Sequence, residues 1–181
     1  MKSSKYLFVF LLLLCLSAFA AVHSIYWTVK DDSYVIKFSG KKVTGTFKGL
    51  KANIIFDENH LEKSKLSGVV DASTINTGNG VMNKEAKDED ALDLKNNTTI
   101  NFASSVIRKS SVGYEAEGEL TIKGISRTVI IPFTLEKNGE DVTFKGHFSL
   151  NPKEYHVDKV NAKQRREMPD KLNIDLSIPV K

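Results

Sequence analysis

Cysteine is almost absent from this sequence of 181 residues. The only one is Cys15, which lies in an apolar segment near the N-terminus that we expect to be removed. A chain without cysteine forms no disulfide, has no thiolate nucleophile and offers no thiolate ligand to a metal. Leu14 precedes Cys15 where a lipoprotein signal has a small residue, so the sequence does not predict lipidation.

Recognisable catalytic patterns are also absent. No serine lies in a G-x-S-x-G context, and the Gly78–Gly80 segment does not lead from a strand into a phosphate-binding pattern. A metal-assisted enzyme that uses His147, His156 and Asp158 is one hypothesis, but nothing in their spacing holds these side chains together. We therefore predict that the protein is not an enzyme and has neither a metal site nor a cofactor.

The chain has no strong excess of charge of one sign. Without the two lysines of the first 22 residues it carries 24 basic and 22 acidic residues, a net charge of +2. The basic cluster Lys163, Arg165 and Arg166 is balanced by Glu167 and Asp170, and no aromatic residue lies among them. This cluster is typical of a solvated loop, so no nucleic-acid partner is predicted.

The first residues form the one long apolar segment. Lys2 and Lys5 precede the apolar run Tyr6–Leu16, which is followed by the small-x-small sequence Ala18–Ala20. This order is typical of a secretory signal peptide, and the run is too short for a stable membrane span. An uncleaved anchor is the alternative interpretation.

We accordingly expect residues 1–22 to be a signal peptide and residues 23–181 to be one domain. Cleavage is expected near Ala21, or alternatively after Ser24. The mature protein would then be periplasmic or secreted, with no stable membrane span after cleavage, and its roughly 160 residues are enough for a single core.

Most of the remaining sequence alternates apolar and polar residues. The clearest stretch is Tyr114–Leu150, where three runs with a period of two are separated by the turn-forming segments Lys123–Ser126 and Lys137–Glu140. Alternation of this kind predicts antiparallel strands with one apolar face. Similar runs along the chain indicate about ten short strands, so the predicted fold is all-β, an antiparallel lipocalin-like barrel of eight to ten strands.

Two segments do not follow this pattern. Asn83–Leu94 is rich in Glu, Lys, Ala and Leu, which predicts one short polar helix with Ala91 and Leu94 against the barrel. Asn151–Asp170 has no strand pattern and is bounded by Pro152 and Pro169. A loop of this length is often a lid or a binding loop, or is simply mobile.

The inward-facing positions are rich in phenylalanine, and an eight-stranded barrel is close to the size at which its interior either is filled or holds one ligand. Gly45, Gly68, Gly118 and Gly146 share the inward register, and two interpretations are equally open: they let the sheet bend, or they leave a cavity. We predict the following lumen residues for a ligand: Tyr34, Ile36, Phe38, Phe47, Ile54, Phe56, Phe102, Tyr114, Leu120, Ile131, Phe133, Phe144 and Phe148.

Several blocks together resemble a known family. The most specific is Leu120–Arg127 (LTIKGISR), followed by Val129–Leu135 (VIIPFTL). Four further segments agree in order and spacing: Ser33–Phe38, Gly45–Gly49, Ser73–Asn79 and Thr99–Ser104. Over Ile25 to Val180 the chain resembles the YceI-like family of lipocalin-like polyisoprenoid-binding domains.

The resemblance implies an extended antiparallel barrel that holds a long isoprenoid or a similar amphiphilic lipid, in proteins that are usually exported. The chain departs from the family pattern at Glu85-Ala86, at Ala91–Asp93, at Thr98-Thr99 and at Asn151–His156. The divergence affects the expected identity of the ligand more than the expected fold.

Our first hypothesis is thus an exported, non-enzymatic binding protein whose partner is a long isoprenoid or another amphiphilic lipid. The alternative is a stress or envelope protein with a filled barrel that acts through its loops. The sequence leaves the ligand's chain length and a homodimer open.

Overall fold

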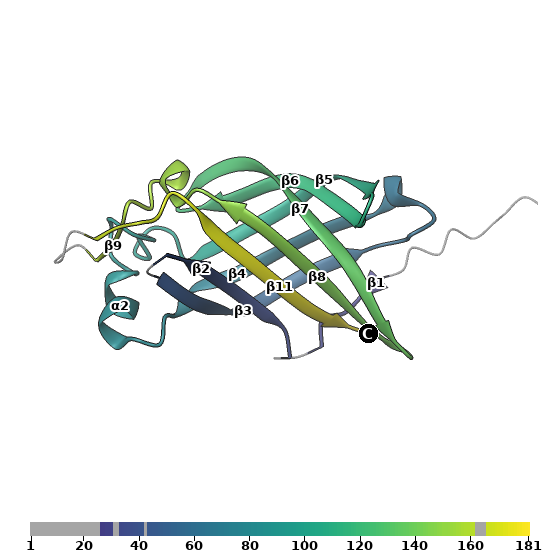
Figure 1. Ribbon diagram of the computed structural model, residues 1–181, viewed down its shortest axis with the longest axis horizontal. Coiled ribbons are helices and arrows are strands. Elements are labelled where there is room, and N and C mark those ends of the chain that lie inside the picture. Colours follow the sequence, from purple (N-terminus) through teal and green to yellow (C-terminus); the bar gives the residue numbers. More distant parts are fainter. Residues whose placement is uncertain (1–25, 31–32, 42, 162–165) are drawn as a thin grey trace, which may run out of the picture.

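The computed structural model describes residues 26–30, 33–41, 43–161 and 166–181 (Figure 1). The predicted signal peptide and the sites of its cleavage lie outside these residues. Within them, no helix has the length and apolar character that crossing a membrane requires.

Nine strands form one antiparallel sheet, and hydrogen bonding between β3 and β4 closes it into an eight-stranded barrel to which β1 is added. This confirms the predicted fold class. The order in the sheet is β1-β3-β2-β11-β8-β7-β6-β5-β4. The strands are β1 (Tyr26–Trp27), β2 (Val35–Gly40), β3 (Val43–Ile55), β4 (Lys65–Asn76), β5 (Thr99–Ser110), β6 (Gly113–Ile122), β7 (Ile125–Asn138), β8 (Asp141–Leu150) and β11 (Leu172–Val180).

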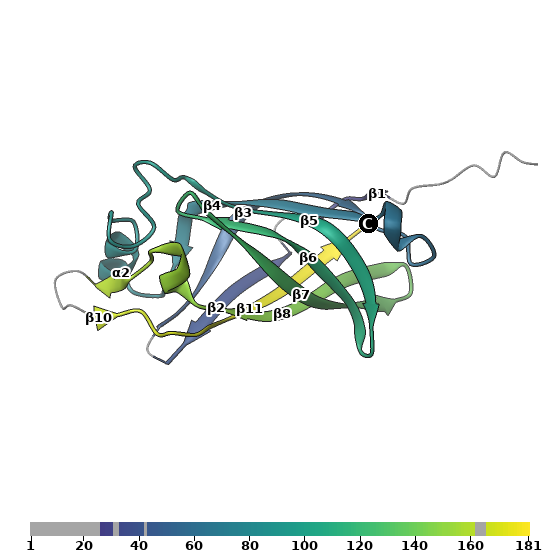
Figure 2. The same ribbon diagram turned by 90° about the horizontal axis from the view of Figure 1, so that it is seen from above.

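The remaining elements are short and lie at the two ends of the barrel. The α-helix α2 spans Gly80–Glu85, and the 3-10 helices η1 and η2 span Leu61–Lys63 and Pro152–Tyr155. Strands β9 (Lys159–Asn161) and β10 (Arg166–Glu167) form a separate pair. Figures 1 and 2 both show α2 and the β9–β10 pair at one end of the long axis and β1 at the other.

The hairpin turns follow from glycine at positions with positive φ. Ile122 pairs with Ile125, so Lys123 and Gly124 form a two-residue loop, with φ of 51° and 73°. Asn138 pairs with Asp141, which leaves Gly139 and Glu140 as the loop, and Gly139 has φ of 62°. Short loops with glycine in this conformation match the twist of the flanking strands, so they fix the register of β6, β7 and β8.

The alternation of apolar residues breaks between Phe47 and Ala52, but β3 is continuous over Val43–Ile55. Its pairing with β4 shifts around Gly49, which has φ of 70°. This bulge inserts a residue, so the inward face moves from Phe47 to Leu50 without a turn. The break in the sequence pattern is real, but a bulge produces it.

The predicted helix over Asn83–Leu94 was placed too far along the chain. The side chain of Asn79 accepts hydrogen bonds from the backbone N–H of Val81 and Met82, and this cap starts α2 at Gly80. Residues 88–97 form turns in which Asp93 has φ of 50°. The predicted contacts with the barrel are nevertheless correct, because Ala91 is buried and Leu94 packs against the core.

Candidate functional site: an apolar cavity inside the barrel

The barrel encloses a cavity of about 270 Å³ whose wall is predominantly apolar. Inward-facing side chains of all eight barrel strands contribute to it. For comparison, an engineered protein cavity of about 150 Å³ stays dry and binds benzene. The space is therefore large enough for an apolar ligand, and the barrel is not completely filled by its own side chains.

Ten of the thirteen predicted lumen residues line this cavity. They come from six different strands and are Ile36, Phe38, Phe47, Ile54, Phe102, Leu120, Ile131, Phe133, Phe144 and Phe148. Tyr34, Phe56 and Tyr114 are outside the lining. The structure thus brings most of the predicted set together around one space, and each of the three exceptions has an identifiable packing role.

Tyr34 holds two strands together. Its hydroxyl accepts a hydrogen bond of 2.9 Å from the backbone N–H of Leu50 on β3, and the ammonium of Lys48 lies 5.0 Å from the ring centroid. Tyr34 precedes β2, and β2 pairs with β3 only over Val43–Phe47. The phenol therefore satisfies a donor where the strand pairing has stopped, which is a structural role.

Phe56 and Tyr114 belong to a cluster of rings that closes one end of the barrel, which we call the aromatic end: Trp27, Phe56, Tyr114, Phe133 and Phe144. Phe56 is only 1% exposed and meets Tyr114, Phe133 and Phe144 edge-on at centroid distances of 5.0, 5.6 and 5.6 Å. Phe133 stacks on Tyr114 at 5.4 Å and on Phe144 at 5.8 Å. Trp27 donates from Nε1 to the Phe56 carbonyl at 3.2 Å.

The opposite end of the cavity is bounded by chain segments without strand structure, and we call it the helical end. Its lining residues are Met82, Ala86, Ala91, Leu92, Pro152, Val157 and Met168. They come from α2, from the turns that follow it, and from the predicted long loop, which contains η2, β9 and β10. Sequence analysis did not identify Met82, Leu92, Val157 or Met168, because no period marks an inward face in these segments.

Side-chain hydrogen bonds to the backbone hold the helical end. Asn79 caps α2, Asn151 accepts from the backbone N–H of Lys153 at the start of η2, and the ammonium of Lys123 donates to the carbonyl of His156 at 2.7 Å. Each is a local bond of modest strength. Local polar contacts of this kind therefore help to fix the helical end.

Two buried polar atoms at the helical end have no hydrogen-bond partner, namely Tyr155 Oη and Glu85 Oε2. Tyr155 is 1% exposed and packs in the same cluster as the cavity-lining residues Val157 and Met168. Burial raises the pKa of its hydroxyl to about 12, with a further contribution from the nearby Glu154 carboxylate. Unpartnered groups of this kind are costly, so they call for an explanation.

The four inward glycines divide between the two interpretations. A Cβ on Gly118 would lie 2.2 Å from the carbonyl oxygen of Ala103, and one on Gly45 would lie 2.5 Å from the Phe38 ring. At these two positions the absence of a side chain lets neighbouring groups lie close to the glycine backbone. Gly68 and Gly146 line the cavity, and their nearest contacts would be 3.4 and 3.3 Å. At these two positions the missing side chain enlarges the lumen.

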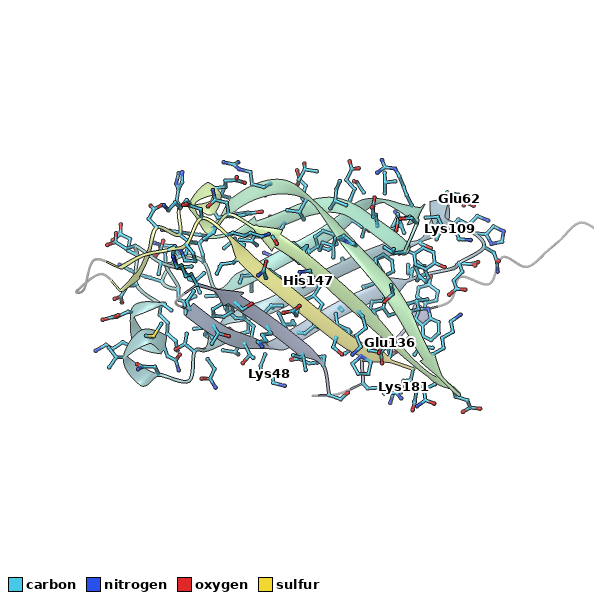
Figure 3. The ribbon with its side chains drawn as sticks, in the orientation of Figure 1. Lys48, Glu62, Lys109, Glu136, His147 and Lys181 are labelled. Carbon is cyan, nitrogen blue, oxygen red and sulfur yellow. The ribbon has the colours of Figure 1, made fainter. Side chains whose placement is uncertain are left out.

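Figure 3 shows polar side chains on the outside of the barrel wall at Lys48, Glu62, Lys109, Glu136, His147 and Lys181. His147 pairs with Asp175 at 2.6 Å on the outer surface. His60 pairs with Asp57 at 2.9 Å, and hydrogen bonds from the Asn59 backbone and from His60 lower the pKa of the Asp57 carboxyl.

In the described part of the chain, no three His, Cys, Asp or Glu side chains are placed to share a metal ion, and His147, His156 and Asp158 form no such group. Of the basic cluster in the long loop, Lys163 and Arg165 lie outside the described residues. What the cavity itself offers is burial of apolar surface.

Comparison with known proteins agrees with this architecture. The model of the YceI-like domain matches residues 27–180. A UPF0312 protein of Serratia proteamaculans is 27% identical over 97 residues, which are 54% of this chain and 50% of that protein. One of Ectopseudomonas mendocina is 25% identical over 122 residues, 64% of each chain. The matched region thus spans about half to two thirds of these relatives.

Among solved structures, BcnA of Burkholderia cenocepacia superposes with a TM-score of 0.78 at 24% identity, covering 85% of this chain and all of that one. A polyisoprenoid binding domain from Saccharophagus degradans, implicated in plant cell wall breakdown, superposes with a TM-score of 0.66 at 13% identity, covering 88% and 99%. At these identities the likeness shows a shared fold. With the family match over almost the whole described chain, it follows that this protein belongs to the YceI-like domain family.

Proposed function

We propose that this protein binds the hydrocarbon chain of an isoprenoid or similar amphiphilic lipid in the barrel cavity, as a carrier without catalytic activity. The observation that carries the proposal is the apolar cavity of about 270 Å³, walled by ten of the residues that alternation predicts. The description of the related Saccharophagus degradans domain as polyisoprenoid binding supports the ligand class.

The mechanism is burial. Each methylene removed from water contributes roughly 0.8 kcal/mol, so ten enclosed methylenes give roughly 8 kcal/mol before ordering and association are subtracted. Lys37 is the only charged residue in the lining. An ionised head group inside this wall would lose its hydration without compensation, so only the hydrocarbon chain belongs there.

We also propose that residues 1–22 direct export, so that the protein works in the periplasm or outside the cell. The support is the order of Lys2, Lys5, the apolar run Tyr6–Leu16 and the small residues Ala18 and Ala20. Expression with this segment, followed by fractionation and N-terminal sequencing of the product, tests export and gives the cleavage site.

The test of lipid binding is native mass spectrometry of the protein expressed with its own N-terminal segment, followed by solvent extraction and mass analysis of the bound species. An isoprenoid mass ladder is the expected result, and the same spectra report the oligomeric state. A bare protein that also refuses added polyprenols would contradict the proposal and favour an interaction protein that acts through its loops.

A substitution that fills the cavity gives a second, independent readout. Gly68→Leu places a side chain in the lumen, where a Cβ meets only Leu50 closely, at 3.4 Å. We expect at least a tenfold loss of lipid affinity in a folded protein. Val69→Leu is the matched control, because the next residue on β4 is exposed at the barrel surface, and it should bind like the wild type.

A further inference from the structure

The floor of the cavity, which is its boundary at the aromatic end, is built from aromatic rings. Phe133 and Phe144 are part of its lining, and Phe56 and Tyr114 stand behind them without lining it. Trp27 also belongs to this second layer, and every ring of it contacts a ring of the first layer at a centroid distance of 5.4–6.4 Å. The floor is thus two aromatic layers thick.

We infer that the aromatic end limits the length of the hydrocarbon chain that the cavity accepts, and that the apolar terminus of the chain rests on Phe133 and Phe144. This inference depends on the proposed function, and it adds a selection by length together with a binding direction.

A longer ligand cannot push the floor rings aside, because the rings are closely packed and have no free space to move into. Phe56 is 1% exposed and contacts three rings at once, so its displacement would disturb all of them. Close-packed interiors respond to such changes as a unit. A chain that has reached Phe133 and Phe144 therefore stops there, and further isoprene units remain at the helical end.

The direction follows from where hydrogen bonds are available. At the floor, the carbonyl of Phe56 already accepts from Trp27 Nε1, and the ring faces of Phe133 and Phe144 offer no donor to a head group. A hydroxyl placed there would lose its hydrogen bonds to water. At the helical end, by contrast, the cavity lining includes Thr77, which carries a hydroxyl group and lies between β4 and α2. The polar end of the ligand is therefore better accommodated at the helical end.

The test is a length series of all-trans prenols from geraniol through farnesol and geranylgeraniol to solanesol, measured by displacement of a fluorescent apolar probe. Affinity should rise roughly fourfold for each added methylene that enters the cavity and then level off once the chain spans it. The length at which affinity levels off is the measured quantity.

Phe144→Ala is the decisive variant, because loss of the ring opens space for about one isoprene unit at the floor. Ile130→Ala is its control: this apolar side chain on β7 is 51% exposed and is not part of the cavity lining. We expect the levelling-off length to increase by about one unit in Phe144→Ala and to stay at the wild-type value in Ile130→Ala.

Each other outcome overturns a specific statement. An unchanged length in Phe144→Ala, or an equal shift in both variants, would overturn the length limit while leaving lipid binding intact. Absence of prenol binding by the wild type would overturn the proposed function itself. Where Phe144→Ala does not fold, Phe144→Leu provides the same comparison with a smaller expected shift.

Discussion

The two ends of the barrel are built by different means. The aromatic end consists of rings on and beside regular strands, and Phe56 at its centre is 1% exposed. The helical end consists of short helices and turns. The side chains of Asn79 and Asn151 accept hydrogen bonds from the backbone there, and the ammonium of Lys123 donates one to it. Packed rings lose many contacts together when one moves, whereas local caps break individually. Under the proposed function, this difference favours the aromatic end as the floor and the helical end as the entrance.

The largest expected effect comes from removing the central ring of the floor. Phe56→Ala should lower the free energy of unfolding by about 3–5 kcal/mol, because it leaves a cavity among Tyr114, Phe133 and Phe144. Urea denaturation followed by circular dichroism measures this change. Met82→Ala at the half-buried helical end is the control and should lose less than about 2 kcal/mol. Equal losses would show that the two ends are equally rigid and would remove the basis of the comparison.

The sequence was sufficient to predict the barrel and most of its lumen, for one physical reason. Side chains on a strand alternate between two faces, so alternation identifies the inward residues wherever strands are regular. It does not report depth along the barrel axis. Phe56 and Phe133 share the inward register, yet only Phe133 lines the cavity, and this depends on which rings from distant strands fill the same layer.

The helical end was largely beyond sequence analysis for a related reason. Met82, Leu92 and Met168 line the cavity from segments in which no constant period relates position to face. The start of α2 at Gly80 was missed because Asn79, which caps it, looks the same in the sequence as an asparagine in a turn. Tyr34 was predicted to line the lumen because it follows the inward alternation. Its hydroxyl instead accepts a hydrogen bond from β3 at the place where the pairing of β2 with β3 ends, and the sequence does not show where that is.

A second prediction concerns a tyrosine at each end. Burial raises the pKa of both Tyr155 and Tyr114, to about 12 for Tyr155. A raised folded-state pKa means that the folded state keeps a proton that the unfolded state loses above its pKa of about 10. The stabilisation is therefore complete below about pH 10 and is lost as the pH rises through about 12.

Tyr155→Phe removes this dependence at the helical end. Between about pH 8 and about pH 11, the free energy of unfolding of the wild type should fall by about 1–1.5 kcal/mol more than that of the variant. The variant should be at least as stable as the wild type at about pH 8, because it lacks a buried hydroxyl without a partner. Chemical denaturation at the two pH values checks both statements. Parallel losses in wild type and variant would instead assign the alkaline sensitivity to other groups, Tyr114 at the aromatic end among them.

The smallest expected effect on stability bears most directly on the entrance. Asn79→Ala removes the acceptor for the backbone N–H groups of Val81 and Met82, at 3.0 and 3.1 Å, and should cost about 1 kcal/mol. If α2 opens independently of the barrel, hydrogen exchange of the Asn83 and Ala86 amides should accelerate roughly fivefold while amides near Phe133 are unchanged. Prenol uptake and release should both become faster with little change in affinity.

Asp57→Ala supplies the matched control for this last prediction, because Asp57 accepts from the backbone N–H of Asn59 in a turn beside the aromatic end. The substitution removes this local acceptor together with the Asp57–His60 pair, but at the floor rather than at the entrance. We expect it to leave both α2 exchange and prenol kinetics at wild-type values. If prenol uptake were faster in Asp57→Ala and unchanged in Asn79→Ala, the entrance would lie at the aromatic end. The assignment of floor and entrance would then have to be reversed.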